Sequence, residues 1–265
     1  MNPSAYVAGI GVLGPGIANW PQAAGILAGH VPFAHAPALL PHPDMLPAAE
    51  RRRTGRLVKL ALAVAAEAVA QADADAARLP SVFTSSGGDG QNSHELCVAL
   101  AAAGREVSPT RFSNSVHNAA AGYWSIATGS NAASNVLCAH DASFTAGLIE
   151  ALTQVAVDRQ SLLLVAYDTD YPEPLRAKRP VPDAFGAALV LTPGEDSRSL
   201  ARIEFTLAQQ PPTGLGDAQL EALRTSVPAA RSLPLLRQLA RREPGAVVLE
   251  YLDPLHAVVM VAPCN

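Results

Sequence analysis

Four residues close together in the chain carry side chains that could do chemistry: Cys138, His140, Asp141 and Ser143. A serine nucleophile, a histidine base and an orienting aspartate are the parts of a hydrolytic or acyl-transferring triad, and His117 is a second candidate base. However, His140, Asp141 and Ser143 are almost consecutive, and chain neighbours rarely line up in the order nucleophile, base and acid. Serine and aspartate ahead of an apolar helix more often cap it, so we predict a capping turn here.

The elements around these residues are an apolar strand, a polar turn and an apolar helix. The pattern predicts the strand at residues 134–138 and the helix at residues 144–157. A strand that turns sharply into a helix presents a side chain at the helix N-terminus, where backbone N–H groups stabilise negative charge. Cys138 ends the apolar run, so we expect a buried strand residue, and burial makes a thiol a poor nucleophile by raising its pKa.

A second polar group, His117 and Asn118, precedes a segment rich in alanine and glycine. On structural grounds alone, we expect His117 to be a half-buried, hydrogen-bonded histidine and Asn118 to cap a helix. Phe112, Tyr123 and Trp124 lie within thirteen positions of each other, although aromatic residues make up only 5% of the chain. Such a concentration fits the core, an interface, or the wall of a shared cavity.

Composition argues against several classes of function. The chain of 265 residues is 49% hydrophobic and 16% charged, and its net charge of -4 offers no broad basic face to nucleic acid. Its three cysteines lie far apart without a CxxC pair, so we expect neither disulfides nor a metal site. No apolar run reaches the roughly 18 residues of a membrane span, and the first residues lack the basic region of a signal peptide. We therefore expect a cytoplasmic protein.

Gly9, Gly11 and Gly14 match the dinucleotide-binding pattern GxGxxG. That motif needs a helix to begin at once and an acidic residue at the end of the next strand. Here Pro15 follows directly, and the first clear acid is Asp44, in a proline-rich loop. We therefore predict a buried strand that ends in a glycine turn, and no cofactor.

Strand and helix patterns alternate between residues 6 and 191, with the clearest helix pattern at residues 51–73. This alternation predicts an α/β fold with a mainly parallel sheet and helices on both faces. From residue 194 the elements become shorter, and the last two strands are expected to form a hairpin. We therefore divide the chain into a domain at residues 1–193 and a short α/β extension at residues 194–265 packed on that domain.

Residues 6–191 resemble β-ketoacyl synthases, the condensing enzymes of fatty-acid and polyketide assembly. The resemblance rests on four segments in the family's order: YVAGIGVLGPGIANWPQAAGILAG, RRRTGRLVKLALAVAAEAVAQA, SVFTSSGGDG and SVHNAAAGYWSIATG. It implies a thiolase-like fold. Because little chain follows Leu191, it also implies a form truncated relative to full ketosynthases.

Two departures from the family pattern concern catalysis. If SLLLVAYD is placed on the strand after the family's nucleophile helix, the catalytic cysteine falls at Ala142, whose methyl group cannot form a thioester. The family uses two histidines in its second half, but the only histidine after His140 is His256, in the terminal strand pair. The chain is thus more similar to the short chain-length-factor class of type II systems, including those that build aryl polyenes, in its SVHN, DSF-like and VAYD segments.

This resemblance implies a non-catalytic subunit that forms a heterodimer with a catalytic ketosynthase and shapes the pocket for a chain carried by acyl carrier protein. Alone, such a subunit could form homodimers. The residues that we assign to the pocket or interface are Phe112, Ser115, His117, Asn118, Tyr123, Trp124, Asp141 and Phe144. Two alternatives stay open: a stand-alone acyltransferase or hydrolase using Ser143 or Cys138 with His140, and a scaffold that stabilises its partner without reaching the pocket.

Overall fold

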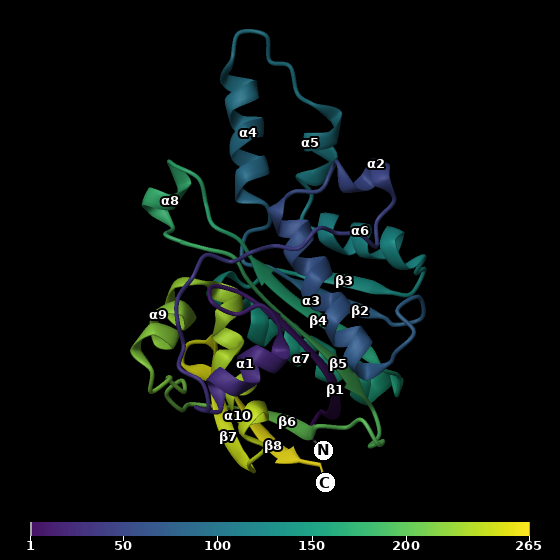
Figure 1. Cartoon of the computed structure of the whole chain (residues 1–265), viewed down its shortest axis with the longest axis vertical. Helices are drawn as coiled ribbons and strands as arrows, with labels where there is room; N and C mark the ends of the chain where they lie inside the picture. The colour runs from purple at the N-terminus through teal and green to yellow at the C-terminus, as the bar shows by residue number, and fades with distance from the viewer. Residues whose placement is uncertain (1, 265) are drawn as a thin grey trace.

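The computed structural model describes residues 2–264, which form one eight-stranded sheet with helices on both faces (Figure 1). The strands are β1 (Ser4–Leu13), β2 (Ser81–Thr84), β3 (Ser134–Leu137), β4 (Leu162–Asp168), β5 (Phe185–Thr192), β6 (Ala201–Ala208), β7 (Gly245–Leu252) and β8 (Leu255–Pro263). The α-helices are α1 (Trp20–Leu27), α2 (Ala48–Arg51), α3 (Arg56–Ala72), α4 (Gly90–Ala101), α5 (Pro109–Asn114), α6 (Ala119–Thr128), α7 (Ser143–Asp158), α8 (Leu175–Lys178), α9 (Ala218–Ser226) and α10 (Leu233–Arg241). Two short 3-10 helices are η1 (His140–Ala142) and η2 (Pro228–Ser232). None of the helices in this described part is long and apolar enough to cross a membrane.

The strands follow the order β3-β2-β4-β5-β1-β6-β8-β7 across the sheet. Only β3, β2 and β4 run parallel to one another, and every other neighbouring pair is antiparallel. The α/β class with helices on both faces is confirmed, but the prediction of a mainly parallel sheet is wrong. Asp168 at the end of β4 pairs with Phe185 at the start of β5, so the loop between them returns at the same end of the sheet. A parallel pair would need a crossover to the opposite end.

The central strands are apolar along their whole length because both faces of the sheet are covered. In β4, Leu162 and Leu164 pack into one core, and Leu163 and Val165 into the other. Helices α3 and α6 cover the second face, while α1, α7 and α10 cover the first. Alternate residues of one strand thus belong to different cores, as the pleat of a strand requires.

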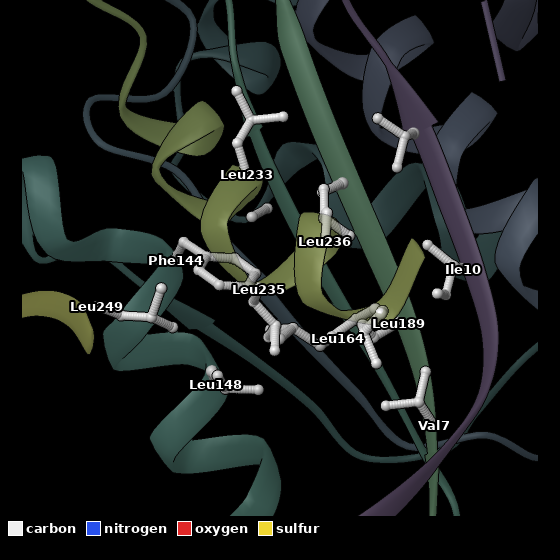
Figure 2. Packing of buried hydrophobic residues seen from close by; sticks show 14 of the residues in the cluster. Val7, Ile10, Phe144, Leu148, Leu164, Leu189, Leu233, Leu235, Leu236 and Leu249 are labelled. Carbon is white, nitrogen blue, oxygen red and sulfur yellow. The ribbon is translucent and has the colours of Figure 1, made fainter. Parts of the chain in front are cut away.

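The C-terminal segment shares the core of the first face. Figure 2 shows Leu235 and Leu236 of α10 packed together with Phe144 of α7 and Leu164 of β4. All four side chains are buried, and each contributes about 1.5–3 kcal/mol relative to an exposed position. In addition, β6 pairs with β1, so the segment after residue 194 extends the same sheet.

The glycines of the GxGxxG pattern have a packing role. A Cβ atom on Gly9 would lie 2.1 Å from the carbonyl oxygen of Ala68, and one on Gly11 would lie 2.0 Å from that of Val64. Both acceptor residues belong to α3, so these glycines let the helix backbone approach β1 closely. The strand ends at Leu13 in a glycine turn, as predicted.

Helices α4 and α5, with the loop between them, project from the body as an arm (residues 90–114; Figure 1). The sequence predicts a helix only at residues 94–103 and leaves α5 as loop. The helix predicted at residues 51–73 is α3, which begins five residues later than predicted, at Arg56. Arg51 instead ends the short helix α2, and Gly55 is the N-cap of α3. The terminal hairpin is confirmed by the pairing of β7 with β8.

Candidate functional site

The predicted strand, turn and helix are all present around residue 140. Strand β3 ends at Leu137, η1 forms the turn, and α7 begins at Ser143. We call residues 138–143 the elbow. Ala142 is the last residue of η1 and the N-cap of α7, and it is half-buried. The helix N-terminus, where backbone N–H groups could stabilise negative charge, therefore carries a methyl group.

The hydroxyl of Ser143 is used inside the elbow. Its Oγ donates to the carbonyl oxygen of His140 (2.7 Å) and accepts from the N–H of Ala139 (3.0 Å). The residue is only 2% exposed. Ser143 is the first residue of α7 rather than its N-cap, so its structural role is to close the turn before the helix and not to cap the helix itself.

The side chain of His140 points to a different partner. Its Nε2 accepts from Nη1 of Arg179 at 2.5 Å, and the imidazole is largely exposed. Asp141 accepts from Nη2 of Arg179 (2.8 Å) and from Nη2 of Arg231 (3.2 Å). The hydroxyl of Ser143 reaches only the backbone of His140, so the three residues do not form a nucleophile, base and acid in sequence.

Cys138 lies outside β3 and is exposed, so the prediction of a buried strand residue is wrong. Its thiol donates to the carbonyl oxygen of Ser86 at 3.3 Å. The reason is the place of β3 at the edge of the sheet, where one long side of the strand has no neighbour. An apolar sequence does not reveal whether its strand lies at the centre or at an edge.

A buried carboxylate behind the elbow was missed by the sequence analysis. Oδ1 of Asp168 accepts from the N–H of Ser86 (2.8 Å) and the hydroxyl of Ser85 (3.2 Å), while Oδ2 has no partner in residues 2–264. Burial raises the pKa of Asp168 to about 6, although the hydrogen bonds from Ser86 and Ser85 lower it. The sequence contains one signal for this buried carboxylate: in VAYD, an acidic residue directly ends an otherwise apolar strand.

The other residues assigned to a pocket or interface fall into two groups. Tyr123, Trp124 and Phe144 are buried in the core. Phe112, Ser115 and Asn118 are exposed. His117 is half-buried beside Gly88, as predicted, but its buried Nε2 has no hydrogen-bond partner within residues 2–264, so the prediction of a hydrogen-bonded ring is wrong for this atom. Asn118 occupies the N-cap position of α6, but its side chain makes no capping hydrogen bond.

Phe112 is one of five large apolar side chains that are exposed on the arm, on α6 or between them, and we call these residues the apolar surface of the arm and α6. Its members are Val98, Leu100, Phe112, Val116 and Ile126, and each is at least half exposed. A groove of about 420 Å³ lies between α2, α5 and α6, with Val116, Gly122 and Ile126 in its lining. Tyr123 fixes one side of this groove, because its hydroxyl donates to Oδ1 of Asn114 at 3.1 Å. Within residues 2–264, no three histidine, cysteine, aspartate or glutamate side chains gather as metal ligands would.

Solved structures share this fold. A chain from a complex of the ketosynthase ApeO with its chain length factor ApeC, from Xenorhabdus doucetiae, has a TM-score of 0.73 and 22% identity over 97% of this chain and 99% of that chain. A chain from the ishigamide ketosynthase/chain length factor has a TM-score of 0.72 and 15% identity over 99% of this chain and 100% of that one. A chain from AntDE:AntF, a type II acyl carrier protein in complex with its ketosynthase, has a TM-score of 0.76 and 11% identity over the full length of both chains.

The expected thiolase-like, ketosynthase-type fold is thereby confirmed. Among curated proteins, no sequence matches this chain significantly. The family model for the β-ketoacyl synthase N-terminal domain matches residues 19–244, which include β3, the elbow and the buried Asp168. This chain belongs to the β-ketoacyl synthase N-terminal domain family.

Proposed function

We propose that this chain is a non-catalytic subunit, a chain-length factor, that pairs with a catalytic β-ketoacyl synthase and shapes its acyl pocket. The observation that carries the proposal is the elbow. Its strand, turn and helix are intact, but Ala142 stands at the helix N-terminus and the hydroxyl of Ser143 closes the turn. A condensing enzyme needs a thiolate to hold the acyl chain, and a methyl group cannot replace it.

Two features of the surface support a protein partner. Strand β3 ends the sheet with residues that are exposed or half-buried, so its outer N–H and C=O groups are available for another strand. The apolar surface of the arm and α6 lies in the same part of the sequence, between residues 98 and 126. Large apolar side chains gathered on a surface commonly mark an interface.

The partner fits a ketosynthase best. The solved structures that share this fold include chains from ketosynthase/chain length factor complexes, and one of those structures also contains an acyl carrier protein. In the proposed heterodimer, the partner's cysteine handles the acyl chain, which the carrier protein delivers. This chain contributes shape, because a pocket rejects additional methylene groups through steric and packing energies.

The pairing is tested by co-expression with a catalytic ketosynthase from the same organism. We expect the two proteins to co-purify in equal amounts and condensation to require both. A ketosynthase that condenses carrier-bound acyl chains equally well without this chain would contradict the proposal. The ketosynthase with its nucleophilic cysteine replaced by alanine is the matched control, since it should keep the pairing and lose condensation.

The alternative of a stand-alone acyltransferase or hydrolase is tested with acyl probes directed at serine and thiol nucleophiles. We expect no stoichiometric, turnover-dependent labelling of Ser143, because this buried hydroxyl already donates to His140. Cys138 is exposed, so a thiol reagent can label it whether or not it is catalytic, and the decisive readout is enzymatic release of the acyl group. Release that disappears in Cys138→Ala or Ser143→Ala would overturn the pseudoenzyme proposal.

The scaffold alternative is tested at Phe112. This ring is exposed on the arm and holds no part of the core together, so Phe112→Ala should leave folding unchanged. If the arm reaches the acyl pocket, the variant complex should make a different distribution of chain lengths. An unchanged distribution in a complex that still forms would favour the scaffold.

A further inference from the structure

The carboxylate of Asp141 lies between two arginines that come from other parts of the chain. Arg179, which follows α8 in the loop between β4 and β5, contacts Oδ1 at 2.8 Å. Arg231 of η2 contacts Oδ2 at 3.2 Å. The elbow is thus attached by charge to two segments that are 38 and 90 residues away in the sequence.

The ion pairs continue into the C-terminal segment. Arg231 also pairs with Glu250 of β7, and Arg224 of α9 joins Glu250 (3.2 Å) to Glu221 (2.7 Å). The side chains of Arg231 and Arg224 are only 14% and 9% exposed. Buried guanidinium groups are tolerated only when carboxylates compensate their charge, and here three arginines face three acids. A buried ion-pair network adds little net stability, because desolvation of the charges offsets their attraction. Its better-attested role is to hold the linked segments in one arrangement.

The elbow needs something to fix its geometry, because its backbone is strained. His140 has φ +51°, the left-handed region that residues other than glycine rarely adopt. Such a conformation persists when the surrounding contacts determine it. Arg179 donates both to His140 and to Asp141, so one guanidinium holds the strained residue and its neighbour together.

We propose that Arg179 and Arg231 form an electrostatic clamp on the elbow, with Asp141 as its hub, and that holding the elbow is a role of the C-terminal segment. Asp141 is then a positioning residue, which acts through the backbone of the elbow. The consequence in a complex rests on the proposed function: a clamped elbow gives the acyl pocket a wall of fixed shape.

The clamp is tested on the full chain by amide hydrogen exchange. The N–H of Ala142 donates to the carbonyl oxygen of Ala139, and the N–H of Ala139 donates to Ser143, so these two amides report on the elbow. In Asp141→Asn we expect both to exchange at least about 10-fold faster, while the amides of β4 keep their protection. Unchanged exchange at both amides would overturn the proposal.

The matched control is Asp73→Asn. Asp73 accepts from Arg198 at 2.5 Å, but this pair is exposed and far from the elbow in the sequence. The control removes the carboxylate partner of one arginine, Arg198, whereas Asp141→Asn removes the carboxylate shared by Arg179 and Arg231. Elbow exchange in the control should stay at the wild-type rate. Faster elbow exchange in the control would overturn the proposal, because the effect would then follow from lost charge in general.

Asp141→Asn leaves Arg231 with less compensation and could prevent folding. In that case Arg179→Met is measured, because Arg179 lies in an exposed loop. Its loss removes one contact to Asp141 and one to His140, while Asp141 and Arg231 remain paired. We expect the two elbow amides to exchange faster in this variant as well, but by a smaller factor than in Asp141→Asn. No change in Arg179→Met would overturn the clamp.

In the complex, Asp141→Asn should co-purify with the ketosynthase and broaden the distribution of product lengths. An unchanged distribution would overturn the assigned consequence of the clamp. Failure of the wild-type chain to pair would instead contradict the proposed function. Hydrogen exchange on the isolated chain distinguishes these two failures.

Discussion

The residues of the elbow combine a strand, a turn and a helix N-terminus with no free nucleophile at residues 142 and 143. Ala142 occupies the helix N-terminus, and the nearest hydroxyl, on Ser143, is bound to backbone groups of the turn. Residue types alone suggested a triad there. The distances decide against it, because His140 and Asp141 both face Arg179 and not the hydroxyl.

At the residue scale, Asp168 should make stability depend on pH. Its pKa is raised by burial to about 6, so the folded chain holds a proton that the unfolded chain releases near pH 4. The contribution of Asp168 to the free energy of unfolding is therefore fully present below pH 4. It decreases by about 2–3 kcal/mol as the pH rises to 6.

Asp168→Asn removes this titration while keeping the shape of the side chain. Urea unfolding of both proteins at several pH values gives the difference in free energy of unfolding. We expect the difference to shift in favour of the variant between pH 4 and 6 and to stay constant above pH 7. A difference that does not change with pH would contradict the assignment. Comparing the two proteins cancels the titration of Glu67 and Asp89, whose pKa values are also raised by burial.

At the scale of elements, the close packing of α3 on β1 is the contact that tolerates least change. A Cβ on Gly9 would lie 2.1 Å from a carbonyl oxygen of α3, which no side-chain movement can relieve. We expect Gly9→Ala to destabilise the chain by about 3 kcal/mol. Gly122→Ala is the matched control, because its Cβ would meet nothing within 4 Å and alanine favours a helix by about 1 kcal/mol. Thermal unfolding should therefore move in opposite directions in the two variants.

The elements themselves were largely predictable, because apolar periodicity is local. The strand before the elbow ends one residue earlier than predicted, and the helix after the elbow differs from its predicted bounds by one residue at each end. The direction of β5 was not predictable, because an apolar strand reads the same in parallel and antiparallel pairing. The exposure of Cys138 was missed for a related reason, since position in the sheet depends on distant strands.

The candidate site was less predictable than the fold. The sequence locates the strand, turn and helix of the elbow, because these are local features. It does not reveal that Asp141 meets Arg231, because the two residues are 90 positions apart and neither belongs to a motif. Long-range ion pairs leave no periodic signal in a single sequence.

At the scale of the whole molecule, the chain has two open regions at one end of its sheet. They are the free edge of β3 and the exposed apolar residues of the arm and α6. Figure 1 shows the backbone of these three parts. The opposite edge, β7, is partly covered, because the N–H of Thr213 donates to the carbonyl oxygen of Val248 and Val248 in turn donates to the hydroxyl of Thr213. A partner is therefore expected at the β3 end.

This asymmetry predicts how the isolated chain responds to a ketosynthase. Alone, it should self-associate as its concentration rises, because exposed apolar side chains and a free strand edge favour contact. With the partner at about 100 times the dissociation constant, binding stabilises the folded chain by about 2.7 kcal/mol, which corresponds to a Tm increase of about 5–10 °C. Phe112→Ser should reduce both effects, whereas Leu252→Ser should reduce neither, although both side chains are 67% exposed, because Leu252 lies in β7 at the other end of the sheet. Equal losses in the two variants would place the partner elsewhere, since general hydrophobicity, and not this surface, would then drive association.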